Sequence, residues 1–171
     1  MEANREYWRA VSVFTNYEVS SVGRVRNSGT GRVLKPSAGG GGYPHVVLNK
    51  DGKQRTRNIH QLVAEAFIEN PEDKRCIDHI DSNKKNNCVE NLRRATHSQN
   101  GMNQKIRTNT SSIYKGVYHH KPTKKWMSYI RINGKLKNLG LFENEKEAAR
   151  KYNEAALEHF GEFAKLNVIE D

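Results

Sequence analysis

The first third of the chain alternates short runs of apolar and polar residues with glycine-rich breaks. The runs lie at residues 17–19, 24–26, 32–34, 45–48 and 55–57. Alternation over a few residues, closed by glycine, is typical of short β-strands. Asp51-Gly52 lies between the last two runs and predicts a tight hairpin turn. Residues 1–58 are therefore expected to form a small β-rich module.

A helical pattern begins at the end of this module. The apolar positions that share one helical face are Leu62, Val63, Ala66 and Phe67. Asn58 and Gln61 have the spacing of a capping box, and Asn70-Pro71 stops the helix. A β run at 75–79, an Asn-rich loop at 81–87 and a second helix near residue 97 follow. This central module is expected to span 59–104.

The last third predicts a sheet followed by one helix. After a polar linker at 105–112, β runs lie at 114–119, 126–132 and 136–142, and Asn133-Gly134 predicts the second hairpin. Asn144 and Glu147 form a capping box. The helix after it carries a flat face of small residues and one tyrosine: Ala148, Ala149, Tyr152, Ala155 and Ala156. Residues 113–171 are expected to form a third module, which makes the fold class α+β.

Charge narrows the range of partners. The net charge is +10 and the sequence pI is about 9.7. Residues 101–142 contain nine Lys or Arg and no Asp or Glu, and residues 20–58 contain eight against one. General solubility would spread these cations evenly, whereas segregation favours a binding face for a polyanion, with nucleic acid as the first candidate.

Two cysteines, Cys76 and Cys88, cannot build a four-cysteine zinc site, and they suit a reduced, intracellular chain. The N-terminal residues have no apolar core of a secretion signal. No apolar run approaches the ~20 residues of a membrane helix. We therefore expect no membrane partner.

The candidate chemistry lies in the central module. Asp78 and His79 are adjacent on a strand-like run, and Asn91 and Asn100 follow. Hydrolysis of a phosphodiester needs a base for the attacking water, and histidine titrates near neutrality. It also needs a hard cation, which binds oxygen ligands such as those of Asp78 and Asn100. Neighbours on a strand point to opposite faces, so this pair requires a local twist.

The segment from Asp78 to Leu92 resembles the HNH nuclease motif in the variant DHxDxNxxNNxxENL, and the stretch from His60 to Asn100 looks like the phage and intron-encoded HNH homing endonucleases. The resemblance implies a ββα-metal fold in which His79 is the general base and Asp78 and Asn100 bind the metal. Asn91 would then orient the histidine or brace the loop. The last position of the motif is often His, whereas this chain has Asn100 there. His97, three residues earlier, is therefore an alternative metal or phosphate ligand. Mg²⁺ is the expected ion and Mn²⁺ the alternative.

The third module resembles the APETALA2/ethylene-response-factor DNA-binding domain over about 112–167. The motifs include 114–117, Trp126, 139–142 and 152–156. That family folds as a three-stranded antiparallel sheet packed on one helix, and the sheet enters the major groove. The expected DNA contacts in this module are Lys115, Tyr118, His120, Lys124, Lys125, Arg131, Lys135 and Lys137.

In the central module, His60 is expected only to pack or cap the start of its helix.

The first module is similar to the small DNA-contacting module that precedes such HNH motifs, through Trp8, 17–20, 23–26 and 34–36. Its expected phosphate contacts are Arg24, Arg26, Arg32, Lys35, Arg55 and Arg57.

Together these resemblances imply a sequence-specific, divalent-metal-dependent DNA endonuclease of the homing type. It would bind double-stranded DNA as a monomer, inside a bacterial or virus-infected cell. The main rival is a DNA-binding regulator whose nuclease centre has decayed. A second rival is an RNA-directed nuclease, which a major-groove reader disfavours because the RNA major groove is too narrow.

Overall fold

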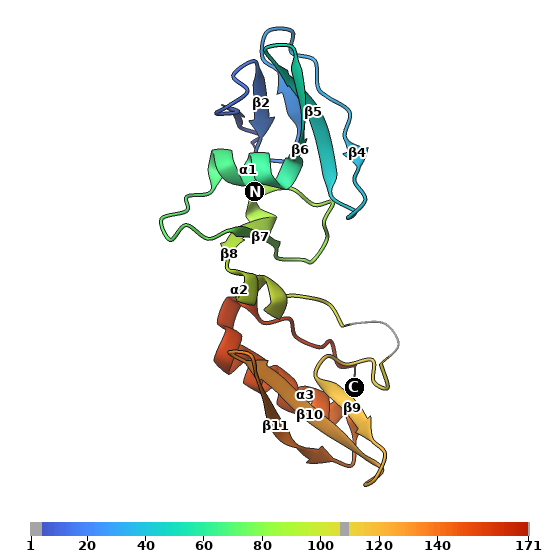
Figure 1. Ribbon diagram of the computed structural model, residues 1–171. Coiled ribbons are helices and arrows are strands. Elements are labelled where there is room, and N and C mark those ends of the chain that lie inside the picture. The colour runs from blue at the N-terminus through green and yellow to red at the C-terminus, as the bar shows by residue number, and fades with distance from the viewer. Residues whose placement is uncertain (1–4, 107–109, 171) are drawn as a thin grey trace. The chain divides into compact units, whose positions relative to one another are not determined.

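The computed structural model describes residues 5–106 and 110–170, and the chain forms two compact units, Met1–Thr96 and His97–Asp171 (Figure 1). The predicted linker at 105–112 lies partly outside the described residues. The unit boundary differs from the four-part division expected from sequence, because the first expected module and residues 59–96 of the second lie in one unit, whereas residues 97–104 lie in the other. Among the described residues, no helix is long and apolar enough to cross a membrane.

The first unit contains two small sheets of three strands each and a β-hairpin. One antiparallel sheet joins β1 (Trp8–Ala10), β2 (Tyr17–Ser20) and β3 (Val25–Asn27). The other joins β4 (Ser37–Ala38), β5 (Pro44–Lys50) and β6 (Lys53–Asn58). The hairpin pairs β7 (Cys76–His79) with β8 (Leu92–Ala95). The predicted run at 32–34 forms only an isolated bridge between Val33 and Arg26.

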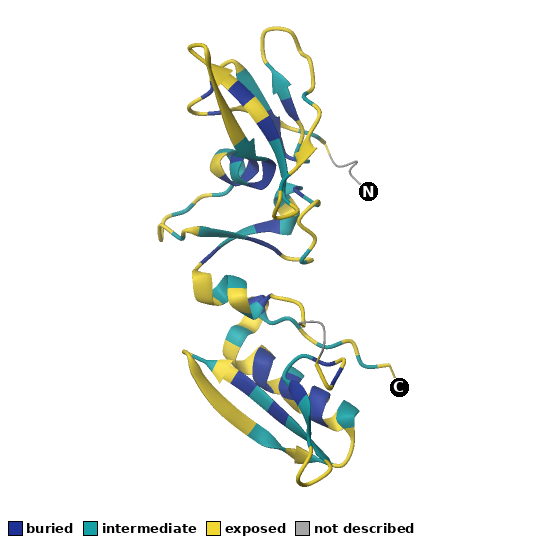
Figure 2. Cartoon of the chain, turned by 45° about the vertical axis from the view of Figure 1, so that its right-hand side comes forward, coloured by how far each residue is buried: buried dark blue, intermediate teal, exposed yellow. Residues whose placement is uncertain are grey.

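One hydrophobic core explains why the first two expected modules fold together. Its buried members come from both sheets (Val19, Val25, Val46 and Leu48), from α1 (Ile59–Phe67) and from β8. Val47 is exposed between buried Val46 and Leu48, which is the period-two pattern of a half-buried strand. Figure 2 shows such an alternation of buried and exposed positions along a strand of this unit. A sheet this small cannot bury its apolar face alone, so α1 completes it.

The second unit is an antiparallel sheet packed on one helix, as the sequence predicted. Its strands are β9 (Val117–His120), β10 (Lys125–Ile132) and β11 (Lys135–Phe142), and β10 is central. The small face of α3 (Glu145–Phe160) packs against Val117 and Ile130. The short helix α2 (His97–Met102) precedes this sheet, and the 3-10 turns η1 (Val89–Asn91) and η2 (Gly161–Phe163) complete the elements.

The local turn predictions can be checked against the backbone. Asp51-Gly52 and Asn133-Gly134 both have two positive φ angles, as a tight hairpin turn requires, so both predictions are confirmed. The capping box at Asn58 is wrong, because its side chain makes no cap hydrogen bond. The predicted run at 114–119 starts as a strand only at Val117. Gly116 delays it: its φ is +75°, and a Cβ there would lie 2.0 Å from the ring of Tyr152.

Candidate active site

Asp78 and His79 end strand β7, and both side chains are buried. Asp78 lies directly opposite Arg93 on β8, whose Nε and Nη2 atoms donate to Asp78 Oδ2 at 2.9 and 2.8 Å. This cross-strand ion pair holds a carboxylate in a buried position, where an unpaired charge would be costly. The hairpin therefore fixes one acidic group beside one histidine.

An amide sets the tautomer of His79. The Nε2 atom of His79 lies 3.1 Å from Oδ1 of Asn87, which is also buried. Asn87 uses its other amide atom, Nδ2, to donate to the carbonyl of Lys85, so its oxygen faces the histidine. An amide oxygen only accepts hydrogen bonds, and Nε2 must therefore carry the proton. Nδ1 is then the basic nitrogen of the neutral ring.

The expected candidate Asn91 braces the loop rather than the histidine. Its Nδ2 donates to Asp81 Oδ1 at 2.9 Å and to the Asn86 carbonyl at 2.8 Å, and its Oδ1 accepts from the Asp81 backbone. Partial burial would raise the pKa of Asp81, but hydrogen bonds from the Asn86 and Asn91 amides and a backbone N–H outweigh it and lower that pKa. The loop thus contains an ionised, well-held carboxylate.

A turn of the first sheet supports the same loop. The carbonyl of Ser21 accepts from the Val89 backbone at 2.8 Å. Gly23, with a φ of +81°, approaches so closely that a Cβ there would lie 2.9 Å from the Cβ of Asn87. The turn at 21–23 and the loop at 87–89 are far apart in sequence and packed in space. The first sheet therefore helps to place the amide that contacts His79.

The rings of His60 and Tyr43 form an aromatic cluster with His79. His60, in the first turn of α1, lies 5.3 Å from His79 between ring centroids in an edge-on arrangement, and Tyr43 lies 4.8 Å from His60. Burial, with a smaller contribution from the charge of His79, lowers the pKa of His60 to about 4. The Lys84 ammonium lies 4.4 Å above the Tyr43 ring and donates to the Gly41 carbonyl.

The expected metal ligands are one carboxylate and one amide oxygen. Asp78 is in the first unit, whereas Asn100 and the alternative ligand His97 are on α2 in the second unit. Within the described ranges, no group of three or more His, Cys, Asp or Glu side chains could hold an ion. The donor chemistry fits Mg²⁺, which commonly takes one or two carboxylates and fills its remaining positions with water and phosphate oxygens.

Comparison with known proteins identifies two segments of the chain. Residues 57–102 match the HNH endonuclease family model, and residues 6–49 match the NUMOD4 motif. Residues 57–102 belong to the HNH endonuclease family. The chain is 34% identical to an uncharacterized HNH endonuclease of Acanthamoeba polyphaga mimivirus over 79% of this chain, and 38% identical to DNA endonuclease I-HmuI of Bacillus phage SP01 over 58%.

The chain spans 40% of the mimivirus relative and 58% of I-HmuI. A solved structure described as DNA binding and cleavage by the HNH homing endonuclease I-HmuI aligns with 90% of this chain and 91% of its own, with a TM-score of 0.55 and 28% identity. The match extends beyond the HNH residues into both flanking regions.

The cations expected to contact DNA in the first unit fall into two groups. Arg24, Arg26 and Arg57 pair with Glu6, Glu18 and Glu65, and the first two also stack over Trp8. Arg32, Lys35 and Arg55 are exposed. Exposed cations are the simpler phosphate contacts, since no carboxylate must be displaced.

In the second unit, strand register divides the expected contacts between two faces. Val117 and Ile130 face α3, so side chains of the opposite parity, Tyr118, His120, Lys125 and Arg131, lie on the face away from α3. Lys137 pairs with Ile130 and Lys135 with Ile132, which places both lysines on the α3 side of edge strand β11. Lys124 occupies a turn position with a φ of 54°.

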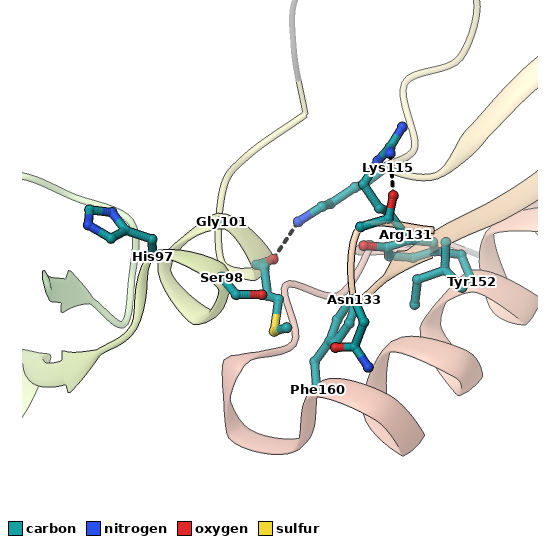
Figure 3. A pocket seen from close by; sticks show the side chains of 11 residues that line it. His97, Ser98, Gly101, Lys115, Arg131, Asn133, Tyr152 and Phe160 are labelled. Atoms are coloured by element: carbon teal, nitrogen blue, oxygen red, sulfur yellow. Dashed lines mark hydrogen bonds between the residues drawn. The ribbon is translucent and has the colours of Figure 1, made fainter. Parts of the chain in front are cut away.

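Lys115 has a different environment. Its Nζ donates to the backbone carbonyls of Met102, the last residue of α2, and of Gln104, at one side of a cavity of about 370 Å³ (Figure 3). Burial and the nearby charge of Lys165 lower the pKa of Lys115 to about 8. This ammonium ties α2 to the sheet, which favours a structural role over a phosphate contact.

His60 was expected to pack or cap, and the structure buries it beside His79. Sequence reasoning did not single out Asn87, which is one of several asparagines in the loop, or Tyr43. The Asn86-Asn87 pair inside the motif was the only available signal for Asn87.

Proposed function

We propose that the chain is a divalent-metal-dependent DNA endonuclease that hydrolyses phosphodiester bonds. The observation that carries this proposal is the contact between His79 Nε2 and Asn87 Oδ1, which makes Nδ1 the basic nitrogen of a buried histidine that directly follows buried Asp78 on β7. A neutral imidazole held in one tautomer is what general-base catalysis near pH 7 requires.

In the proposed mechanism, Nδ1 of His79 accepts a proton from the attacking water. Asn87 keeps the ring oriented and accepts a stronger hydrogen bond as the ring becomes cationic. Asp78 and Asn100 would hold the metal, and Arg93 orients the Asp78 carboxylate. When bound, the cation supplies charge neutralisation at the phosphate and the departing oxygen, with Mg²⁺ proposed and Mn²⁺ as the alternative.

The partner is proposed to be double-stranded DNA, bound by a monomer with cations of both units. The second unit is proposed to be an APETALA2-like reader, supported by its three-stranded sheet packed on one helix. A role in homing is supported by the similarity to the homing endonuclease I-HmuI, and a setting inside a bacterial or virus-infected cell by the phage and viral sources of the relatives.

The test is plasmid cleavage with Mg²⁺, on a substrate that includes the DNA flanking this gene. His79→Ala should lower the cleavage rate by about 10²–10⁴-fold and leave DNA affinity unchanged, and a chelator should abolish cutting. His159→Ala, at an exposed histidine in the last turn of α3, is the matched control and should cut normally. If the wild type binds this DNA but does not cut it in the presence of any divalent metal, the chain is a regulator instead.

A further inference from the structure

His60 carries a buried polar atom with no partner. The side chain is 8% exposed, and its Nδ1 is one of three buried, unpaired side-chain atoms among the described residues. A buried polar atom without a hydrogen bond destabilises the folded state, and native proteins rarely keep one without a functional reason. Phenylalanine would fill a ring-shaped space without this cost. The presence of histidine therefore points to a use for its nitrogens.

The position of His60 suggests that use. The centroid of its ring lies 5.3 Å from that of His79 and 4.8 Å from that of Tyr43. A phosphate whose attacking water is within reach of His79 is therefore within a few ångströms of His60. No other described side chain at this histidine is both buried and unpaired.

The tautomer follows from burial. An orphaned N–H is rarer in native proteins than an orphaned lone pair, which places the lone pair on Nδ1 and the proton on Nε2. Nε2 is not among the buried, unpaired atoms. The low pKa keeps the ring neutral at physiological pH, so the ring can donate without first being protonated.

We propose that His60 is a second catalytic histidine, a neutral donor whose Nε2–H binds a non-bridging oxygen of the scissile phosphate. This role rests on the proposed endonuclease function and goes beyond it, since HNH chemistry as argued above requires only His79. A preorganised donor at an oxygen that gains charge lowers the barrier because it needs no rearrangement during the reaction.

Two substitutions separate donation from ring packing. His60→Phe keeps a ring and removes the donor, whereas His60→Gln keeps a neutral N–H and removes the ring. His60→Phe should lower kcat by about 10²-fold or more with little change in DNA affinity, and His60→Gln should recover at least part of that loss. Equal activity of wild type and His60→Phe, or a Gln variant no better than Phe, would overturn the proposal.

Folding is checked in the same samples. His60→Phe should unfold at the wild-type temperature or above, because the unpaired nitrogen is gone. Leu62→Ala, at a fully buried position of the same helix, should lower the unfolding temperature while the folded protein keeps its kcat. If His60→Phe loses kcat while its unfolding temperature is not lowered, the loss is due to removal of the N–H donor.

A measurement without cleavage distinguishes this inference from the proposed function. Side-chain ¹⁵N spectra of the free protein near neutral pH should show His60 as a neutral ring protonated at Nε2. An Nδ1-protonated or cationic ring would contradict the donor proposal even if the wild type cuts DNA. Failure of the wild type to cut any DNA would instead count against the proposed function.

Discussion

At the scale of single residues, one amide decides which nitrogen of His79 can act as the base. Asn87 presents its oxygen to Nε2 because its Nδ2 is committed to the Lys85 carbonyl. A residue that does not contact the substrate but hydrogen-bonds an active-site histidine commonly contributes one to two orders of magnitude of activity. The importance of Asn87 therefore rests on orientation, not on contact with DNA.

Asn87→Ala removes this acceptor and should lower kcat by roughly 10–100-fold while DNA affinity stays the same. The rate loss follows because both tautomers of His79 become available and the ring can rotate. Single-turnover cleavage and DNA binding should be measured side by side. Asn49→Ala, at an exposed position of β5, is the matched control. Unchanged cleavage by Asn87→Ala would contradict the assigned orientation.

His60 predicts how stability depends on pH. Burial lowers its pKa from 6.5 to about 4 in the folded protein, so the unfolded chain takes up a proton first as the pH falls. The contribution to stability is intact above pH 6.5 and is lost progressively towards pH 4. His60→Phe should therefore flatten the decline between neutral pH and about pH 5, a range in which most carboxylates stay ionised. Thermal unfolding of both proteins measures it, and parallel curves would refute the assignment.

At the scale of elements, the support of the catalytic loop by the 21–23 turn ties the first sheet to the chemistry. Gly23 can make this contact because it lacks a Cβ and has a positive φ. The region that matches the NUMOD4 motif therefore packs against Asn87, in addition to carrying cations that are proposed to contact DNA.

Gly23→Ala should lower stability by about 1–3 kcal/mol and also reduce kcat, because the added methyl pushes against Asn87. The chain offers a close control in Gly31→Ala, whose φ is +68° and whose Cβ would meet open space. That variant should show the backbone cost alone, with normal cleavage by the folded protein. Chemical denaturation and cleavage rates measure both. If the two variants lose the same activity, the contact with Asn87 has no catalytic role.

Sequence patterns predicted helices, strands and turns better than they predicted which residues contact one another in the fold. Asp51-Gly52 and Asn133-Gly134 were found because a tight hairpin restricts φ at two residues, which is local information. The sharing of one core by the first two expected modules was not found, because an apolar pattern shows that Val46 and Leu62 are buried but not that both belong to one core. Asn87 was missed for the same reason: amide side chains in one loop differ only in where the fold places them.

At the scale of the whole molecule, the charge is a prediction about DNA affinity. Of the 29 Lys and Arg residues, three arginines in the first unit pair with glutamates, so the number of cations overstates the number of phosphate contacts. Each cation that does contact a phosphate releases counterions, and the affinity then falls with salt.

Replacing exposed Arg32, Lys35 or Arg55 by alanine should reduce the slope of log affinity against log salt by about 1 for each true contact. Lys151→Ala removes the same charge, but Lys151 already pairs with Glu154 on α3 at 2.9 Å, so this variant should keep the wild-type slope. Binding of one DNA duplex should be titrated from about 0.05 to 0.2 M salt. A long-range effect of net charge would weaken binding in all four variants alike, whereas specific phosphate contacts should change the slope only in the three variants of the first unit.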